Sequence, residues 1–332
     1  MKNAILALFS GVLLLVGGSA QAQKLTASDY FAAKDYPQTV SFPGGVTMTT
    51  MTYSTLPGYR PLVMDVYRPA DNRMHPGLVF FHGGSFVGGT PKFDPPFGNF
   101  PGVLAAIAAH GYVVASADYR LANEARFPAA LQDVKTAIRF LRTHAKDLNL
   151  DEAHIATWGA SAGGYLAVMT GVTCGVASLE PPAQNGAQNP GPLASDCVQA
   201  VEDWSGFLVL DHMFTDIGKP MPATSQEGMF LGCEPSVCPA ETLRAANPMT
   251  YVSDKSPPML IQHGDLDTTL AAKQPQDLAA ALRAKNVKAE FVSYPGVGHM
   301  FIAANRGGDA VQDQAVLDKM LAFLDATFPQ KR

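Results

Sequence analysis

Short apolar runs alternate along this chain with longer stretches in which apolar residues recur every three or four positions. The runs are typical of buried strands, and the spaced stretches are typical of amphipathic helices. The predicted strands cover 47–55, 62–68, 77–81, 112–116, 151–158, 198–202, 259–263 and 289–294. The predicted helices cover 103–110, 129–148, 164–169, a stretch ending at 286, and 316–328. This order predicts an α/β fold with a mostly parallel central sheet, helices on both faces and an antiparallel pair at the start.

One region interrupts the alternation. Residues 173–250 contain Pro181-Pro182, Asn185-Gly186 and Asn189-Pro190-Gly191-Pro192. A long irregular segment inside an α/β domain is usually a lid or a binding loop, although a surface excursion without function is the alternative. No internal repeat or linker is visible, so we expect residues 23–332 to form one domain that carries this insert.

The strongest chemical signal is Gly159-Ala160-Ser161-Ala162-Gly163, a G-x-S-x-G pentapeptide between a predicted strand and a predicted helix. A Ser in a sharp strand-to-helix turn leaves little room for neighbouring side chains, which explains the flanking Gly residues. Such a turn raises the hydroxyl above the sheet edge, where a base can reach it. Because the chain contains 30 Gly, the pentapeptide alone is a modest signal and other motifs must support it.

Two later motifs offer the base and the carboxylate that a nucleophilic Ser requires. His263-Gly264-Asp265-Leu266-Asp267 follows one predicted strand, and Gly296-Val297-Gly298-His299 follows the next. Carboxyl ends of parallel strands share one edge, so both motifs should lie beside Ser161. His299 is the candidate base, and Asp265 competes with Asp267 as the acid. The remaining histidines have no matching context or are expected to pack: His75, His110, His144, His154, His212 and His263.

A Gly-rich motif, His82-Gly83-Gly84-Ser85-Phe86, directly follows the predicted strand 77–81. Gly83 and Gly84 can present backbone N–H groups that no side chain blocks. Together with the N–H of Ala162 they would form an oxyanion hole for a tetrahedral intermediate. A phosphate-binding loop is a weak alternative, because the motif has neither G-x-G-x-x-G nor a P-loop Lys.

Six motifs together resemble the α/β-hydrolase superfamily, most closely the hormone-sensitive-lipase-like esterases and their secreted bacterial relatives, some of them feruloyl esterases. In chain order the motifs are His82-Gly83-Gly84, Asp118-Tyr119-Arg120-Leu121, Phe127-Pro128-Ala129-Ala130, Gly159–Gly164, His263-Gly264-x-x-Asp267 and Gly298-His299. The resemblance covers roughly residues 45–328, and its Ser, Asp, His order is that of the superfamily. The usual H-G-x-x-D pattern favours Asp267 as the acid. The second and third motifs would be scaffold, and Ser85 departs from the common H-G-G-G pattern.

The resemblance implies a secreted serine carboxylesterase that forms an acyl-enzyme and needs no cofactor or metal. Its expected partner is a small-molecule or polymer-borne ester. One alternative is an amide-bond hydrolase of the same fold, either a prolyl-oligopeptidase-like peptidase or an arylformamidase. Another is a binding protein with a decayed site, which the presence of Ser161, Asp267 and His299 argues against. Candidates to line an aromatic substrate pocket, if they do not pack in the core, are Phe86, Tyr165 and Trp204.

The first 22 residues resemble an export signal. Lys2 precedes the apolar stretch 4–16, which is too short to span a bilayer, and Ala20-Gln21-Ala22 is a typical cleavage site. We therefore expect cleavage after Ala22 and a secreted or periplasmic protein without a membrane anchor. A retained N-terminal anchor is the alternative.

Composition narrows the range of partners. Lys and Arg number 24 and Asp and Glu number 29, a net charge of −5, and no basic stripe is visible. Nucleic acid and anionic membrane surfaces are therefore poor candidate partners. With 47% apolar and 16% charged residues, the chain is typical of a globular enzyme. The sequence leaves the oligomeric state open.

Four cysteines remain after processing, and in an oxidising compartment they allow three disulfide connectivities. We favour Cys174–Cys197 and Cys233–Cys238, and the second pair closes a short loop, for which the entropy cost of closure is lowest. A zinc site is disfavoured, since no His lies near the C-x4-C pair. Because Cys174 follows the predicted Ser161 helix, we expect its disulfide to hold the insert over the Ser161 edge of the sheet.

Overall fold

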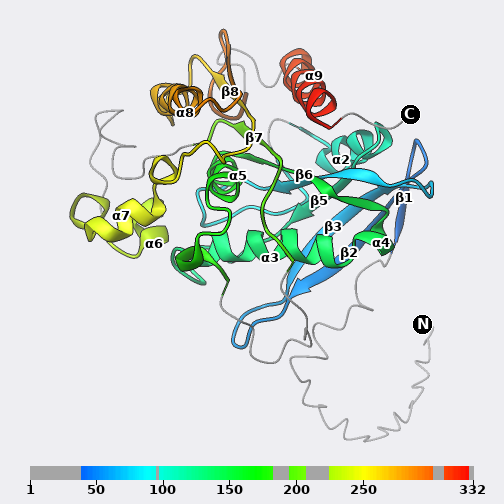
Figure 1. Ribbon diagram of the computed structural model, residues 1–332, viewed down its shortest axis with the longest axis horizontal. Helices are drawn as coiled ribbons and strands as arrows, with labels where there is room; N and C mark the ends of the chain where they lie inside the picture. The colour runs from blue at the N-terminus through cyan, green and yellow to red at the C-terminus, as the bar shows by residue number, and fades with distance from the viewer. Residues whose placement is uncertain (1–38, 95–96, 182–193, 207–223, 302–309, 329–332) are drawn as a thin grey trace, which may run out of the picture.

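The computed structural model describes residues 39–94, 97–181, 194–206, 224–301 and 310–328 (Figure 1). The predicted export signal, residues 1–22, and its cleavage site lie outside the described residues. Within these ranges, no helix has the length and apolar character needed to cross a membrane.

A nine-stranded sheet forms the centre of the molecule, in the order β1-β2-β3-β5-β4-β6-β7-β8-β9. The first three strands pair antiparallel with their neighbours, and the strands from β5 to β9 are all parallel. The bounds are β1 Val40–Phe42, β2 Val46–Ser54, β3 Leu62–Pro69, β4 His75–Phe81, β5 Val113–Ala117, β6 Leu150–Ala160, β7 Ala200–Trp204, β8 Met259–Gly264 and β9 Ala289–Tyr294. The predicted mostly parallel sheet is confirmed, with β1 as an additional edge strand.

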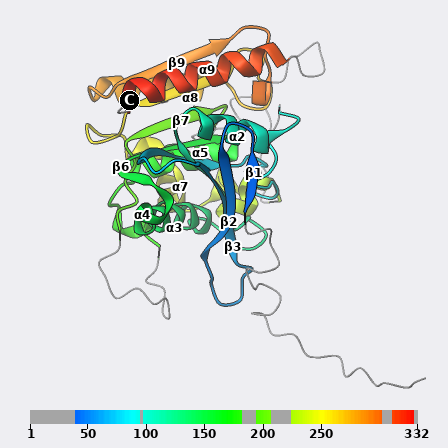
Figure 2. The same cartoon turned by 90° about the vertical axis from the view of Figure 1, so that its right-hand side faces the viewer.

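Helices cover both faces of the sheet (Figure 1). Their bounds are α2 Phe100–Ala109, α3 Ala129–Thr143, α4 Ala145–Leu148, α5 Ala162–Val172, α6 Gln226–Leu231, α7 Ala240–Ala246, α8 Lys273–Ala284 and α9 Ala310–Thr327. Short 3₁₀ turns cover Ala177–Leu179, Pro235–Val237, Pro248–Thr250 and His299–Phe301. Figure 2 shows α8, α9 and β9 together at one end of the sheet, away from β1 and β2.

Strand β4 shows why the apolar runs predicted buried strands. All seven of its residues are buried, because the strand lies in the middle of the sheet with helices on both sides. Leu78 and Phe80 pack in the cluster that includes α2 and α9. Val79 and Phe81 pack in the opposite cluster, with α3, α5 and α8. Alternate side chains therefore build two cores, one on each face.

The insert predicted at 173–250 is not one continuous lid. Strand β7 (Ala200–Trp204) lies inside it and pairs with β6 and β8 in the sheet. The structure contains the predicted disulfide Cys174–Cys197, with a Cα–Cα distance of 4.8 Å. It lies where α5 ends and shortly before β7 begins, at the amino edge of the parallel strands.

Our expectation that this disulfide holds an insert over the Ser161 edge is therefore wrong. The physical reason is the length of α5, whose 11 residues carry the chain about 16 Å back across the sheet. A hydrogen bond from Arg142, at the end of α3, to the carbonyl of Cys197 fixes the disulfide at that far edge.

The second disulfide, Cys233–Cys238, belongs to the segment that does lie near the Ser161 edge. Phe230, on α6, stacks on Phe86 with ring centroids 3.8 Å apart. Phe86 lies two residues after the H-G-G motif, which follows the carboxyl end of β4. The segment that contains α6 and α7 is thus packed against the Gly-rich loop.

Candidate active site

Ser161 occupies the turn between β6 and α5, with φ 54° and ψ −116°. A positive φ is uncommon for a residue other than Gly and indicates backbone strain, often at functional sites. The flanking glycines are required by close contacts: a Cβ at Gly163 would lie 1.9 Å from the Phe81 carbonyl oxygen. A Cβ at Gly159 would lie 2.2 Å from the Gly163 oxygen. The Ser161 N–H donates to the Trp204 carbonyl at 2.8 Å, which ties the turn to β7.

A chain of hydrogen bonds joins Ser161 to His299 and Asp267. The Ser161 hydroxyl lies 3.0 Å from His299 Nε2, and His299 Nδ1 lies 2.7 Å from Asp267 Oδ2. The carboxylate accepts from Nδ1–H, so Nε2 is free to accept the Ser161 proton. The His299 side chain is 21% exposed, whereas that of Asp267 has no exposed surface. The Ser–His end of the chain is therefore accessible and its acid end is sealed.

Asp267 is held by four polar contacts. Its Oδ1 accepts from the backbone N–H groups of Thr269 and Leu270, each at 2.8 Å. Its Oδ2 accepts from His299 and also lies 3.3 Å from Nε2 of His263. Burial by itself would raise the pKa of Asp267, but the hydrogen bond from His299 and the other donors hold it below the usual value. The carboxylate is therefore kept ionised.

Asp265, the competing acid, has a different place. Its Oδ1 accepts from the N–H of Gly296 at 2.7 Å, and its own N–H donates to the Tyr294 carbonyl. These bonds join the loop after β8 to the loop after β9. Asp265 therefore holds together the two loops that carry Asp267 and His299.

The Gly-rich loop lies directly against the Ser161 turn. A Cβ at Gly83 would lie 3.0 Å from the Ala160 oxygen and 3.5 Å from the Ser161 Cβ. Burial raises the pKa of Asp94, while the backbone N–H of the nearby Gly83 acts in the opposite direction; the role of Gly83 as an oxyanion donor stays a prediction. Asp94 lies in the loop that follows the Gly-rich motif. No local sequence pattern predicts that this loop comes back to Gly83.

Gly84 and Ala162 are the other two predicted donors. Gly84 has φ +115°, and a Cβ there would lie 2.3 Å from the Gly88 oxygen, so only Gly fits. Its carbonyl accepts from Val87 and Gly88, which closes the loop into a tight turn. Ala162 is the first residue of α5, where backbone N–H groups have no partner within the helix.

The motif Asp118-Tyr119-Arg120-Leu121, which we expected to be scaffold, contacts the start of this loop. Tyr119 donates from its hydroxyl to the His82 carbonyl at 2.8 Å and stacks on the His82 ring at 4.3 Å. Arg120 and Asp133 form a buried ion pair at 2.7 Å. The two Tyr119 contacts fix His82, which follows β4 and begins the Gly-rich loop.

The three aromatic residues expected to contact a substrate are packed in the core instead. Phe86 and Tyr165 are 0% exposed, and Trp204 is 1% exposed. The Tyr165 hydroxyl donates to the Ala246 carbonyl, and Trp204 Nε1 donates to Glu202. Their side chains have no surface to offer a substrate, so the structure does not support that expectation.

Two buried residues near the site escaped the sequence analysis. Asp203, at the end of β7, lies so close to α5 that a Cβ at Gly164 would be 2.3 Å from its Oδ1. Burial raises the pKa of Asp203 to about 7. The second is Asp94, in the loop beyond the Gly-rich motif. An acid at the end of a buried strand was the available signal for Asp203, whereas Asp94 had none.

The other histidines of the described residues lie elsewhere and pair locally. His75 contacts Asp71, His110 contacts Asp325, and His154 contacts Asp151, while His144 caps its own helix. His212 lies outside the described residues. No group of three or more His, Cys, Asp or Glu side chains in the described ranges could hold a metal ion.

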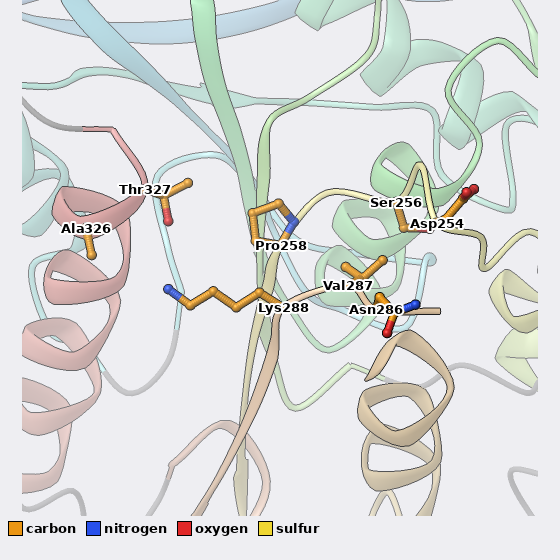
Figure 3. Close-up of a pocket in the computed structure, with 8 residues that line it drawn as sticks. All are labelled: Asp254, Ser256, Pro258, Asn286, Val287, Lys288, Ala326 and Thr327. Carbon is orange, nitrogen blue, oxygen red and sulfur yellow. The ribbon is translucent and has the colours of Figure 1, made fainter. Parts of the chain in front are cut away.

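A hollow of about 370 Å³ lies at the amino ends of β8 and β9, on the edge opposite Ser161 (Figure 3). It is lined by Asp254, Ser256, Pro258, Asn286, Val287, Lys288, Ala326 and Thr327. Its position separates it from the Ser161 site.

The sheet order, the Ser turn between β6 and α5, and the acid and His loops at one edge define an α/β-hydrolase. A family model described as BD-FAE matches residues 64–282. The match covers more than half of the chain, and the protein therefore belongs to the BD-FAE family.

Known relatives and solved structures agree with this assignment. The chain is 28% identical to esterase LipC of Mycobacterium tuberculosis over 72% of its own length and 57% of the relative. It is 27% identical to esterase LipQ of the same organism, over 79% and 59%. It thus spans less than two thirds of either relative. A truncated carbohydrate esterase from gut microbiota superposes with a TM-score of 0.66 at 26% identity, over 84% of this chain and 96% of that one. Esterase 2 of Thermogutta terrifontis, bound to propionate, gives 0.65 and 26%, over 86% and 94%.

Proposed function

We propose that the protein is a carboxylic-ester hydrolase in which Ser161 is the nucleophile, His299 the base and Asp267 the acid. The observation that carries this proposal is the unbroken hydrogen-bond chain from Ser161 Oγ through both ring nitrogens of His299 to Asp267. Family membership and the esterase activity of the similar proteins support ester bonds as the target.

The reaction proceeds in two halves. His299 Nε2 takes the hydroxyl proton while Ser161 Oγ attacks the ester carbonyl, and the imidazolium then gives that proton to the leaving alcohol. Water hydrolyses the acyl-enzyme with His299 as base again. Asp267 holds the reactive tautomer and stabilises the imidazolium. Gly83, Gly84 and Ala162 supply the N–H donors that bind the negative oxygen of both tetrahedral intermediates.

We infer a preference for short acyl groups. Solved forms of Thermogutta terrifontis esterase 2 hold propionate and butyrate, and the buried positions of Phe86 and Tyr165 in this chain leave neither ring to line an aromatic pocket.

The two disulfides support export of the protein to an oxidising compartment. N-terminal sequencing of the exported protein tests this proposal.

A panel of p-nitrophenyl acetate, butyrate and laurate, together with methyl ferulate and the amide p-nitroacetanilide, tests the function. We expect kcat/KM for acetate or butyrate to exceed that for laurate by about tenfold or more, because a site that prefers short acyl groups offers a long chain no matching contacts. Amides should be cleaved far more slowly. Faster cleavage of the amides would instead identify an amide-bond hydrolase, and cleavage of neither would contradict the proposal.

The two disulfides should affect different properties. The double variant Cys174→Ser/Cys197→Ser loses a bond across a separation of 23 residues, which should lower the free energy of unfolding by about 3 kcal/mol. Its kinetics should stay within about twofold of the parent, because the bond lies at the amino edge.

The matched variant is Cys233→Ser/Cys238→Ser, whose separation is only 5 residues. It should lose about 2 kcal/mol but alter the ratio of kcat/KM for small and bulky esters, since its segment packs against Phe86. Chemical denaturation and steady-state kinetics measure both effects. A larger kinetic change in the first variant than in the second would contradict this assignment.

A further inference from the structure

His263 lies on β8, four residues before Asp267, and its side chain has no exposed surface. Its Nε2 is 3.1 Å from the carbonyl oxygen of Leu270 and 3.3 Å from Asp267 Oδ2. Both neighbours are acceptors, so Nε2 must carry a proton. Among the described residues, Nδ1 has no hydrogen-bond partner. The ring is therefore a neutral donor that points its N–H at the acid loop.

Leu270 links this donor to the carboxylate. Its carbonyl accepts from His263, and its own N–H donates to Asp267 Oδ1 at 2.8 Å. The loop 267–270 is thus closed around the carboxylate and anchored to β8 through one imidazole. An apolar side chain of the same size would leave the Leu270 carbonyl without this donor and would remove the N–H beside Oδ2.

The charges around His263 keep it in this state. Burial lowers the pKa of His263, and the nearby His299 lowers it further, although Asp267 acts in the opposite direction. Asp265, the other acid of the loop, is held by Gly296. Asp267 Oδ2 therefore lies between two N–H groups, that of His299 and that of His263.

We infer that His263 is a positioning residue for Asp267, which orients the carboxylate toward His299 and shares its negative charge. This inference rests on the proposed function, because it assigns His263 a part in the same reaction. Without the His263 N–H, the charge of Asp267 would act on His299 alone. In the pH profile of kcat/KM, the acidic limb would then move to higher pH. The loop 267–270 would also be held less firmly, which would lower kcat.

Two substitutions in the full chain separate positioning from packing. His263→Leu removes the donor, whereas His263→Gln places an amide N–H where Nε2 lies. We expect His263→Leu to lower kcat about tenfold with KM within about twofold, and to move the acidic limb up by about half a pH unit. His263→Gln should recover most of kcat and the parental limb.

His75→Leu is the matched control. His75 is another buried strand histidine, with Nε2 2.7 Å from Asp71, at the far edge of the sheet. Its loss should reduce thermal stability without moving the acidic limb. Identical limbs in His263→Leu, His263→Gln and the parent would overturn the inference, as would equal kcat losses in the two His263 variants.

An NMR titration of the His299 ring gives a readout that does not need turnover. In the parent and His263→Gln the ring should titrate alike, and in His263→Leu it should titrate at higher pH. Should His263→Leu fail to fold, His263→Asn, whose shorter amide does not reach Leu270, takes its place. If esters are not cleaved but the titrations differ as expected, the proposed function fails while the coupling of His263 to Asp267 stands. Unchanged titrations would overturn that coupling.

Discussion

Ser161→Ala should lower ester turnover by about 10⁴-fold or more while the protein remains folded, because the members of a Ser–His–Asp arrangement act as a unit. The substitution removes the oxygen that lies 3.0 Å from His299 and little else. The Ala side chain is smaller than that of Ser, so it fits in the turn, where the positions of Gly159 and Gly163 have no room for a Cβ. We would measure kcat on p-nitrophenyl acetate and thermal unfolding of both proteins.

Ser205 provides the control for this experiment. It also has a positive φ, 48°, at the end of a parallel strand, and its buried hydroxyl has no hydrogen-bond partner among the described residues. Ser205→Ala should therefore retain near-parental kcat. A folded Ser161→Ala protein that keeps its activity would exclude Ser161 as the nucleophile.

Covalent labelling gives an independent check on the same residue. Esterase 2 of Thermogutta terrifontis is phosphorylated by paraoxon. When the protein with Ser161 is treated with paraoxon, it should gain one phosphoryl adduct on the peptide that contains Ser161. The Ser161→Ala variant should gain none on that peptide. A label on another Ser would move the nucleophile.

The candidate site could be predicted from short motifs, because the close packing around each motif restricts which residues fit there. Gly159 and Gly163 are needed since a Cβ at either would meet backbone atoms of the same turn or of β4. The alternation of apolar runs and helical spacing likewise follows from burial of β4 and its neighbours on both faces. Such features leave a readable pattern in the sequence.

Features that depend on distant contacts left no such pattern. The approach of Asp94 to Gly83 depends on the path of the loop between them, and the position of the Cys174–Cys197 disulfide depends on the length of α5. Helices α6 and α7, with 6 and 7 residues, are too short to show periodicity. Whether an aromatic ring lines a pocket or packs in a core is decided by what covers it, as Phe230 covers Phe86.

The acid could not be chosen from spacing alone, since Asp265 and Asp267 lie two residues apart. The structure distinguishes their contacts: Asp267 accepts from His299 at 2.7 Å, and Asp265 accepts from Gly296. The difference should appear as a large difference in rate between the two amide variants.

Asp267→Asn should lower kcat/KM by about 10³ to 10⁴-fold, because an amide can offer its NH₂ group to His299 Nδ1 and so favour the tautomer with hydrogen on Nε2. That tautomer cannot accept the Ser161 proton. Asp265→Asn should lose less than about tenfold, since the Asn oxygen can still accept from Gly296. Both proteins should be compared with the parent by kcat/KM across pH 6 to 9, with unfolding curves to show that each is folded. The reverse ranking, with Asp265→Asn the more impaired of two folded variants, would transfer the role of the acid to Asp265.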